Sequence, residues 1–401
     1  MIYFCVAILV IIEWLEFSFF LYLAPTFTKV FFPTETNEYL IIFYLIFFIS
    51  YIARPIGAIF FGVTADMFGR KKPLLVSALL LGVSTICIGL IPGYNAIGWY
   101  APLLLLLFRI VQSFAISGEC NNSALYLIEI SKNENKIRAG SIIGFASSAG
   151  MFIGGIIALY SMLHDDGQSE VWRYVYILLG TLGFLTFFLR KKIKESTEFI
   201  NNKTDKFSFL ELRMAIGKQL KPILCVVIIG GFMSMYIYTL NIYFYAYMVE
   251  KNWYQAKTSL FIIVLTQGFV TLLIPIFSKY ARVSSYKKIF VIAVLMFPII
   301  SILLLQFSGN LFWLILGVLM YSLANGFIST VIFYYMYDLL KFEYRCLITS
   351  VAWVLPATFI GGLSPAVAQT LTSYGYSLII SFIVLIFSLT TAYSIKKTTK
   401  I

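Results

Sequence analysis

The chain has 401 residues, of which 60% are hydrophobic and only 12% are charged, and its mean hydropathy is +0.90. A soluble protein of this length would expose far more charge, so these values exclude the soluble classes and place the apolar surface against lipid. At about 20 residues for each membrane helix plus short loops, the length accommodates about twelve spans.

Cysteine and histidine do not form a disulfide or metal pattern. The five cysteines are odd in number and include no CxxC pair, so we interpret them as small buried apolar residues. His164 is the only histidine, which excludes a histidine-rich metal site. The chain also lacks a Walker A motif, a nucleophile–histidine pair and a metal cluster, so we expect no enzyme, no metal and no cofactor.

Twelve apolar runs with few charges predict an all-α membrane protein of about twelve transmembrane helices. Without the alternating pattern of a barrel, only helices satisfy so much backbone in lipid. The first run lacks a basic n-region and a small-residue cleavage site, so we expect a span rather than a cleavable signal. The runs lie at 4–26, 39–63, 74–92, 101–128, 139–163, 171–190, 222–249, 257–278, 289–307, 311–337, 346–371 and 375–395.

Lys and Arg fall mainly in alternate loops. The loops after the second, fourth, sixth, eighth and tenth runs, together with the carboxyl terminus, hold 24 of the 30 basic residues, and the opposite loops hold four. This asymmetry predicts that both termini face the cytoplasm. It also explains the net charge of +12 without nucleic acid as a partner. The usage of Ile, Lys, Asn and Phe indicates an AT-rich bacterial genome, so we expect the membrane to be a bacterial inner (plasma) membrane.

One long polar stretch divides the chain. It predicts a cytoplasmic linker at 191–221, partly an amphipathic surface helix, between six-helix bundles at 1–190 and 222–401. The two bundles look like a repeat, because an acid, an arginine and a Gly-Gly pair recur with the same 16-residue spacing from arginine to glycine. The matching residues are Glu129, Arg138, Gly154 and Gly155 in the first half, and Asp338, Arg345, Gly361 and Gly362 in the second.

The loop after the second span reads GVTADMFGRKKP from Gly62. Gly62 permits close helix approach, and Gly69 permits a tight turn. Asp66 can face the N-terminus of a neighbouring helix, and Arg70, which Lys71 follows, can pair with a carboxylate. The joint spacing favours a latch that can be made and broken over a plain basic loop that anchors topology.

This loop resembles the signature of the major facilitator superfamily. Other stretches are similar to its metabolite:proton symporter family, which includes proline/betaine and α-ketoglutarate permeases. The resemblance implies the two-bundle fold, alternating access and a cytoplasmic gate closed by Asp66, Arg70, Glu129 and Arg138, with Asp338 and Arg345 at the corresponding second-half positions. The similar stretches are EWLEF from 13, ARPIGAIFFG from 53, RIVQSFAISGE from 109 with ALYLIE from 124, VWRYVYILLG from 171 and FIGGLSP from 359.

Two departures from the family pattern matter. The fourth span has Ser117-Gly118-Glu119, followed by Cys-Asn-Asn, where the family has Gly-Gly-Glu and small residues. The second-half copy of the loop, FSKYARVSSYKK, has Lys279 near the position where an acid is expected. Whether a second latch works is therefore left open.

Five charged residues lie inside predicted spans, namely Glu13, Glu16, Arg54, Arg109 and Glu119. Each would cost at least about 2.5 kcal/mol at a lipid-facing centre, so each is expected to face a cavity or a partner. Glu13 and Glu16 share a helix face, and two close carboxylates do not both ionise cheaply, so one would hold a proton. We predict proton coupling by Glu13, Glu16 or Glu119, and the alternative is structural pairing with the arginines.

Substrate contacts are predicted in both halves. Arg54, which precedes Pro55, and Arg109, which shares a stripe with Gln112, can each grip a carboxylate at two points. Salt bridges to the glutamates are the equal alternative. The second half has no charge inside its spans and offers polar and aromatic contacts, for which packing is the alternative. These are Tyr236, Asn241 and Asn325.

The sequence therefore predicts a monomeric secondary transporter that carries a small molecule with a proton across the bilayer by alternating access. The charges fit a small organic acid or zwitterion, either a dicarboxylate or a proline/betaine-like solute. The alternative from another class is a non-transporting membrane sensor or degenerate relative, which would bind without accumulating its ligand. A channel is disfavoured because the chain has no recognisable filter.

Overall fold

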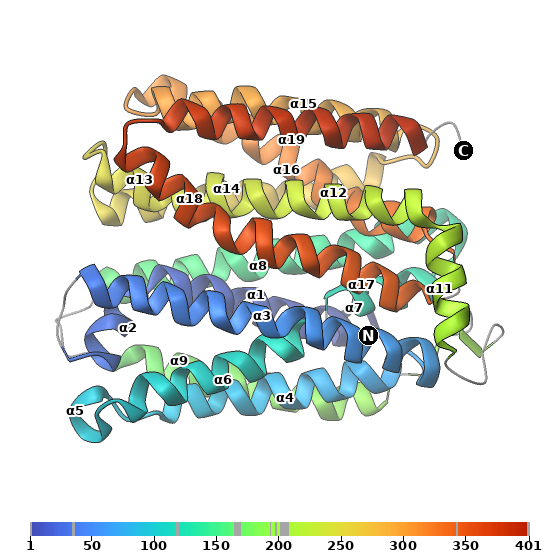
Figure 1. Cartoon of the computed structure of the whole chain (residues 1–401), viewed down its shortest axis with the longest axis horizontal. Coiled ribbons are helices and arrows are strands. Elements are labelled where there is room, and N and C mark those ends of the chain that lie inside the picture. Colours follow the sequence, from blue (N-terminus) through green and yellow to red (C-terminus); the bar gives the residue numbers. More distant parts are fainter. Residues whose placement is uncertain are drawn as a thin grey trace.

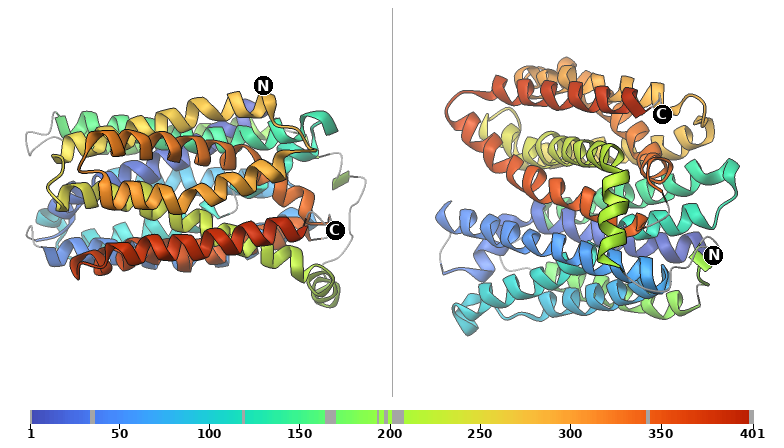
Figure 2. Two further views of the ribbon diagram at one scale, coloured as in Figure 1. Left: turned by 90° about the horizontal axis from the view of Figure 1, so that it is seen from above. Right: turned by 45° about the vertical axis from the view of Figure 1, so that its right-hand side comes forward.

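The computed structural model describes residues 2–33, 37–117, 120–163, 170–192, 194–196, 199–200, 208–341 and 344–398. Within these ranges, twelve helices are long and apolar enough to cross a membrane, as predicted. They run along the long axis of the molecule, and α1 begins at the end where α19 finishes (Figures 1 and 2). We name this the terminus end and the opposite one the far end.

The first half supplies six spans. Its fourth span is the pair α6 and α7, and short helices follow α1, α4 and α7 in the connections. The elements are α1 (Ile2–Tyr22), α2 (Ala24–Phe31), α3 (Asn37–Phe68), α4 (Lys71–Leu90), α5 (Tyr94–Ile97), α6 (Tyr100–Ile116), α7 (Cys120–Glu129), η1 (Asn133–Asn135), α8 (Lys136–Leu163) and α9 (Val171–Lys191).

The second half supplies the other six spans, three of which contain a π-helical segment. The elements are α11 (Phe209–Lys218), α12 (Leu220–Ile237), η2 (Tyr238–Tyr243), α13 (Phe244–Glu250), α14 (Ala256–Tyr280), α15 (Tyr286–Ile302), η3 (Leu303–Phe307), α16 (Leu311–Leu339), α17 (Arg345–Pro356), η4 (Ala357–Gly361), α18 (Gly362–Ser373) and α19 (Ser377–Thr398). Such π-helical turns occur frequently at functional sites.

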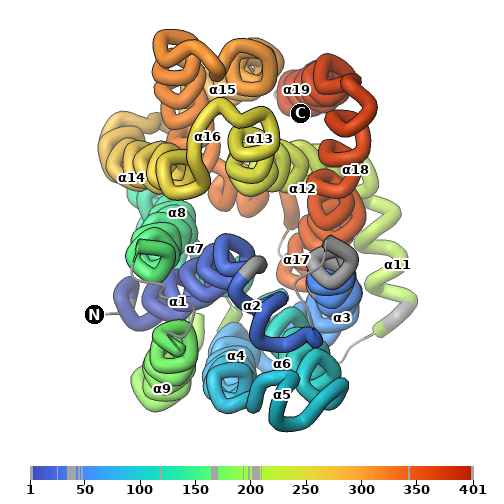
Figure 3. The backbone as a smooth tube through the Cα atoms, turned by 90° about the vertical axis from the view of Figure 1, so that its left-hand side faces the viewer, coloured from blue at the N-terminus to red at the C-terminus, as the bar shows by residue number. Residues whose placement is uncertain are grey.

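Seen along the helices, the two halves form two groups of helices that face each other (Figure 3). Between them, α3 packs against α17, and α8 packs against α14 and α16. Lipid gives no hydrophobic drive for helices to associate, so close packing at small residues must supply it. The architecture is the two-bundle all-α fold that the sequence predicted.

Glycines carry much of this packing within each half. A Cβ added to Gly82 of α4 would lie 2.5 Å from the backbone nitrogen of Phe184 in α9. Real Cβ atoms do not approach backbone so closely, and the neighbouring helix would have to shift. Gly217 in α11, by contrast, has open space where its Cβ would be.

We predict that Gly82→Val destabilises the first half by about 1–3 kcal/mol, because the added side chain overpacks the contact between α4 and α9. The measurement is the apparent Tm of the purified protein in detergent. Gly217→Ala is the control and should leave the Tm unchanged. Equal Tm values for Gly82→Val and the wild type would contradict the close helix contact.

Candidate functional site

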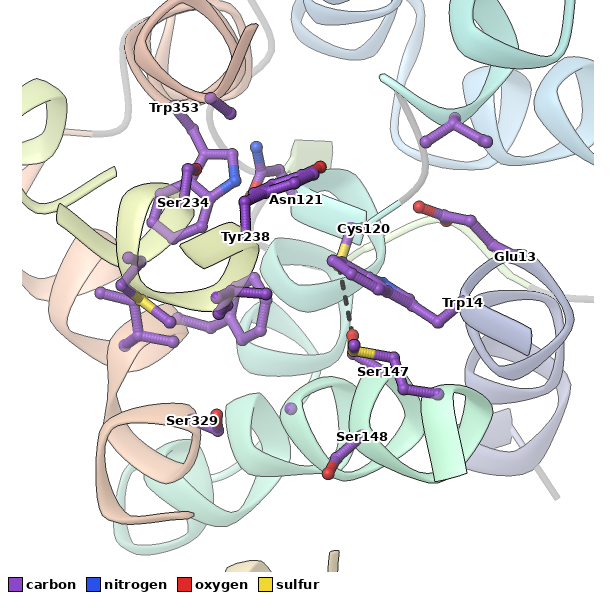
Figure 4. A pocket seen from close by; sticks show the side chains of 18 of the residues that line it. Glu13, Trp14, Cys120, Asn121, Ser147, Ser148, Ser234, Tyr238, Ser329 and Trp353 are labelled. Carbon is purple, nitrogen blue, oxygen red and sulfur yellow. Dashed lines mark hydrogen bonds between the residues drawn. The ribbon is translucent and has the colours of Figure 1, made fainter. Parts of the chain in front are cut away.

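A cavity of about 120 Å³ lies at the centre of the molecule, between the two halves. A polar space of this size has room for several water molecules. Among the described residues, two charged side chains line it, Glu13 of α1 and Arg54 of α3, together with aromatic side chains that include Trp14, Tyr238 and Trp353. Figure 4 shows Glu13 and Trp14 on one side of the cavity and Tyr238 and Trp353 on the other.

Neutral polar side chains complete the lining, and some of their hydrogen-bonding atoms are unused. The side chains of Gln267 and Ser148 meet across the two halves, with Gln267 Nε2 donating to Ser148 Oγ at 2.7 Å. Asn121 Oδ1 and Trp14 Nε1 are buried and have no hydrogen-bond partner within the described part of the chain. Both residues line the cavity, so these atoms are available to a polar solute.

The three predicted second-half contacts lie at two depths, one at the surface of the cavity and two behind that surface. Asn325 lines the cavity, and the Tyr236 hydroxyl behind it donates to Asn325 Oδ1 at 2.8 Å. Asn241 lies in the π-helical segment η2, where its Nδ2 donates to Gln267 Oε1 at 3.2 Å. The structure thus brings Asn325 to the cavity surface and places Tyr236 and Asn241 behind that surface, as supports for its lining.

The two glutamates of α1 have different surroundings. Glu16 is 1% exposed, and its Oε1 accepts hydrogen bonds from Arg109 Nη1 at 2.7 Å and from the Tyr176 hydroxyl at 2.8 Å. Arg109 also donates to Gln112 Oε1 at 2.9 Å. These residues form a buried cluster inside the first half, whereas Glu13 lines the cavity.

Arg54 and Glu119 are the two remaining charged residues that were predicted inside the spans. The Arg54 guanidinium lies over the ring of Tyr51, 3.8 Å from its centroid, and it interacts electrostatically with Glu13. The contact with the Tyr51 ring holds the Arg54 guanidinium beside the cavity. Glu119 lies outside the described residues.

Tyrosines join the two halves on the far-end side of the cavity. The hydroxyls of Tyr51 and Tyr238 are hydrogen-bonded to each other, and the ring of Phe17 packs edge-on against Tyr238 at 5.9 Å. Further out, the Tyr22 hydroxyl donates to Asn241 Oδ1 at 3.3 Å. These contacts join α1 and α3 to η2, whose Tyr238 lines the cavity. Sequence analysis missed Phe17, Tyr22 and Tyr51 because aromatics are abundant throughout the chain.

On the terminus-end side, the predicted latch is assembled around Arg70, which is fully buried. Arg70 Nη2 and Nε donate to the two carboxylate oxygens of Glu129, at 3.0 and 3.2 Å. Arg70 Nη1 donates to Asp66 Oδ1 at 3.1 Å. A two-point arginine–carboxylate pair of this kind has a fixed geometry as well as strength.

The latch reaches the second half through the start of α17. Asp66 accepts the backbone N–H groups of Cys346 and Leu347, at 3.2 and 2.8 Å, where the positive end of the helix dipole favours a carboxylate. Arg345 Nη1 lies 3.7 Å from Glu129 Oε1. A Cβ on Gly62 would lie 2.6 Å from the Leu347 Cα, so a glycine is needed where α3 crosses α17.

Two further loop residues have local roles. Gly69 adopts φ = +97°, which side chains disfavour and glycine permits. Lys71 Nζ donates to the carbonyl of Lys191 at 2.7 Å and joins the start of α4 to the end of α9. The loop therefore turns sharply and is held at both of its flanks.

In the second half, the acid that corresponds to Glu129 has different partners. Asp338 pairs with Lys287 of α15 at 3.3 Å and accepts the Tyr286 hydroxyl at 3.1 Å. Lys279 is exposed, and so is Arg138 in the first turn of α8. The Asp338 pair lies within the second half, and the gate role predicted for Arg138 stays a prediction.

Linker residues that sequence analysis missed also hold the latch. Glu195 accepts the backbone N–H groups of Arg70 at 2.9 Å and Lys71 at 3.2 Å, where α4 begins. Ser196 Oγ donates to Glu129 Oε2 at 2.8 Å, and the Phe199 ring centroid lies 5.5 Å from the Arg70 guanidinium. The partners are about 60 to 130 residues apart in the chain, and no local pattern joins them.

The model of the Major Facilitator Superfamily matches residues 6–365. The chain belongs to this superfamily. It is 31% identical over 329 residues to a Staphylococcus haemolyticus (strain JCSC1435) relative whose provisional name is proline/betaine transporter, covering 79% of this chain and 69% of the relative. The proline/betaine transporter of Escherichia coli (strain K12) is 32% identical over 191 residues, 47% of this chain but only 38% of that protein.

Solved structures of the superfamily share the fold. The human organic anion transporter MFSD10 superposes with a TM-score of 0.79 at 13% identity, over 98% of each chain. The proton:xylose symporter XylE gives a TM-score of 0.78 at 15% identity, over 98% of this chain and 95% of XylE. The protein is thus a multi-pass membrane transporter of the major facilitator superfamily.

We predict that Glu195→Ala lowers stability by about 1 kcal/mol, as the loss of a helix cap does, because two N–H groups at the start of α4 lose their acceptor. The apparent Tm in detergent measures the effect. Glu134→Ala, at an exposed position of η1, is the matched control. If both variants melt together with the wild type, the linker does not cap α4.

Proposed function

We propose that this protein is a proton-coupled symporter of a small zwitterion of the proline/betaine type. It works by alternating access in a bacterial plasma membrane, as a monomer with bundles at 1–190 and 222–401 and with the linker 191–221 and both termini in the cytoplasm. The observation that carries the proposal is the central cavity, which both halves line and which, among the described residues, holds one carboxylate and one guanidinium beside several aromatic rings.

The lining fits a solute with both charges. A carboxylate of the solute pairs with Arg54, and its cationic group lies against the faces of Trp14, Trp353 or Tyr238. A dicarboxylate is a poorer match, because Arg54 is the one cationic side chain that lines the cavity among the described residues, and a second carboxylate would have no cation to pair with. The names of the bacterial relatives support the same class of solute.

Glu13 is the proton-carrying group in this proposal. It faces the cavity, where water can deliver and remove a proton. Glu16 cannot take a proton in the same way without disrupting its ion pair with Arg109 and its hydrogen bond from Tyr176. We therefore assign Glu16, Arg109 and Gln112 to holding α1 and α6 in register behind the cavity.

Alternating access follows from the two sets of contacts that enclose the cavity. The latch of Asp66, Arg70, Glu129 and Arg345 closes the cytoplasmic side, and the Tyr51–Tyr238 contact closes the outer side. Opening either set while the other holds exposes the bound solute to one side only. A loaded carrier with protonated Glu13 would reopen inward and release both solute and proton.

We predict that Glu13→Gln abolishes uphill accumulation but retains exchange of solute across the membrane, because the glutamine preserves shape and hydrogen bonding without taking up a proton. The measurement is uptake of labelled proline or glycine betaine into proteoliposomes with an imposed pH gradient. Glu134→Gln, exposed on η1, is the control and should accumulate solute normally.

Three results would overturn parts of this assignment. Normal accumulation by Glu13→Gln would remove Glu13 as the coupling site. Accumulation that survives a protonophore and follows a sodium gradient would exclude proton coupling. Solute binding by the purified protein without any uptake would instead identify a non-transporting sensor.

The latch is tested through Cys346, which is fully buried beside Asp66. In a protein that keeps only this cysteine, Asp66→Asn should raise the rate of Cys346 alkylation about tenfold, since a hydrogen bond to a charged group contributes about 1.5 kcal/mol or more. Asp338→Asn is the matched control, because its ion pair lies within the second half. Equal alkylation rates in all three proteins would contradict a latch at Asp66.

A further inference from the structure

The helix α11 in the linker has an orientation unlike that of the spans. It lies across their direction at the terminus end and leads directly into α12 (Figures 1 and 2). Ser208 begins it by accepting the N–H of Glu211 on its hydroxyl at 3.3 Å. A capped helix that lies crosswise to the spans where α12 begins has the orientation of a helix that lies along a membrane surface.

One side of α11 is packed against the protein. Ala215 is 4% exposed and Gln219, which follows the helix, is 2% exposed. Gln219 Oε1 accepts the backbone N–H of Lys341 at 2.7 Å. These contacts fix the rotation of the helix about its axis.

The fixed rotation leaves large apolar side chains uncovered. Leu210 is 65% exposed, Met214 is 48% exposed and Ile216 is 38% exposed. Leu210 and Met214 are four residues apart and lie on one face. Large apolar side chains that gather on one exposed helix face are typical of a site that contacts a protein or a membrane.

The exposed charges on and beside α11 are mostly basic. Arg213, Lys218 and Lys221 are exposed. The acidic residue of the helix, Glu211, accepts the hydroxyl of Tyr344 at 3.3 Å. Large exposed apolar residues together with lysine and arginine characterise helices that lie in the membrane interface and bind anionic lipid.

We propose that α11 binds the cytoplasmic leaflet, with Leu210 and Met214 inserted among the acyl chains and with Arg213, Lys218 and Lys221 on anionic phospholipid headgroups. This inference rests on the cytoplasmic placement of the terminus end in the proposed function. It is independent of the solute and of the coupling ion.

The same helix touches the latch. Tyr344 is the N-terminal cap of α17, with φ = 56°, and its hydroxyl accepts the Ser208 N–H at 3.3 Å as well as donating to Glu211. The next residues of α17 donate to Asp66. Anchoring α11 in the leaflet therefore steadies the helix start on which the latch closes.

The experiment follows a fluorophore at the apolar face of α11. A protein without native cysteines carries Met214→Cys labelled with an environment-sensitive dye, in nanodiscs of phosphatidylcholine with or without phosphatidylglycerol. Nitroxide lipids labelled near the headgroup should quench this dye strongly, and phosphatidylglycerol should increase the quenching. The same dye on Asn133→Cys, at an exposed position of η1, should show little quenching.

Charge variants distinguish the binding of anionic lipid at α11 from a general attraction between the basic protein and anionic lipid. The triple variant Arg213→Gln, Lys218→Gln, Lys221→Gln should lose the increase caused by phosphatidylglycerol. The triple variant Arg282→Gln, Lys288→Gln, Lys397→Gln, with exposed residues outside α11 and the same change of net charge, should keep it. Quenching at Met214 no greater than at Asn133, or the same response to lipid in both triple variants, would overturn the proposal.

A separate measurement tests whether lipid binding at α11 acts on the latch. In the protein with Cys346 alone, phosphatidylglycerol should slow the alkylation of Cys346, and Tyr344→Phe should abolish that slowing while leaving the quenching at Met214 intact. Unchanged slowing in Tyr344→Phe would show that α11 does not act on α17 through Tyr344. Neither measurement requires transport, so a failure of the proposed proton coupling would leave both results interpretable.

Discussion

The cost of placing charge in hydrocarbon governs this structure. A charged side chain facing lipid at mid-membrane costs at least about 2.5 kcal/mol, and the described charges inside the spans avoid that position in two ways. Glu16 and Arg109 neutralise each other inside the first bundle, whereas Glu13 and Arg54 face the central cavity. The first pair holds helices together, and the second gives the cavity its chemistry.

The same principle explains how the cavity is enclosed. At the terminus end, buried ions and a helix dipole join the halves through Asp66, Arg70 and Glu129. On the far-end side, neutral tyrosines join them, with Tyr51 and Tyr22 bonded to the π-helical segment η2. The latch is asymmetric, because the second-half acid Asp338 pairs with Lys287 of its own half.

The apolar runs, together with the resemblance of the motifs to a known family, were sufficient to predict the fold. The apolar runs predicted twelve spans, and the motif from Gly62 to Arg70 predicted a latch, because the residues of one short loop share one local geometry. The partition of Glu13 from Glu16 could not be predicted, since it depends on where Arg109 and Tyr176 lie in space. Glu195 and Tyr344 were missed for the same reason, as each contacts residues far away in the chain.

The central claim is that the two halves must separate at the terminus end during each cycle, and a reversible cross-link tests it most directly. A Cβ on Gly140 of α8 would lie 3.4 Å from the Cβ of Phe333 in α16, close to the separation of about 3.5–4.5 Å found in disulfides. In a protein with cysteines at these two positions only, oxidation should abolish uptake and a thiol reductant should restore it, and the oxidant should leave the uptake of each single-cysteine protein unchanged. Undiminished uptake by the cross-linked protein would contradict alternating access through this cavity.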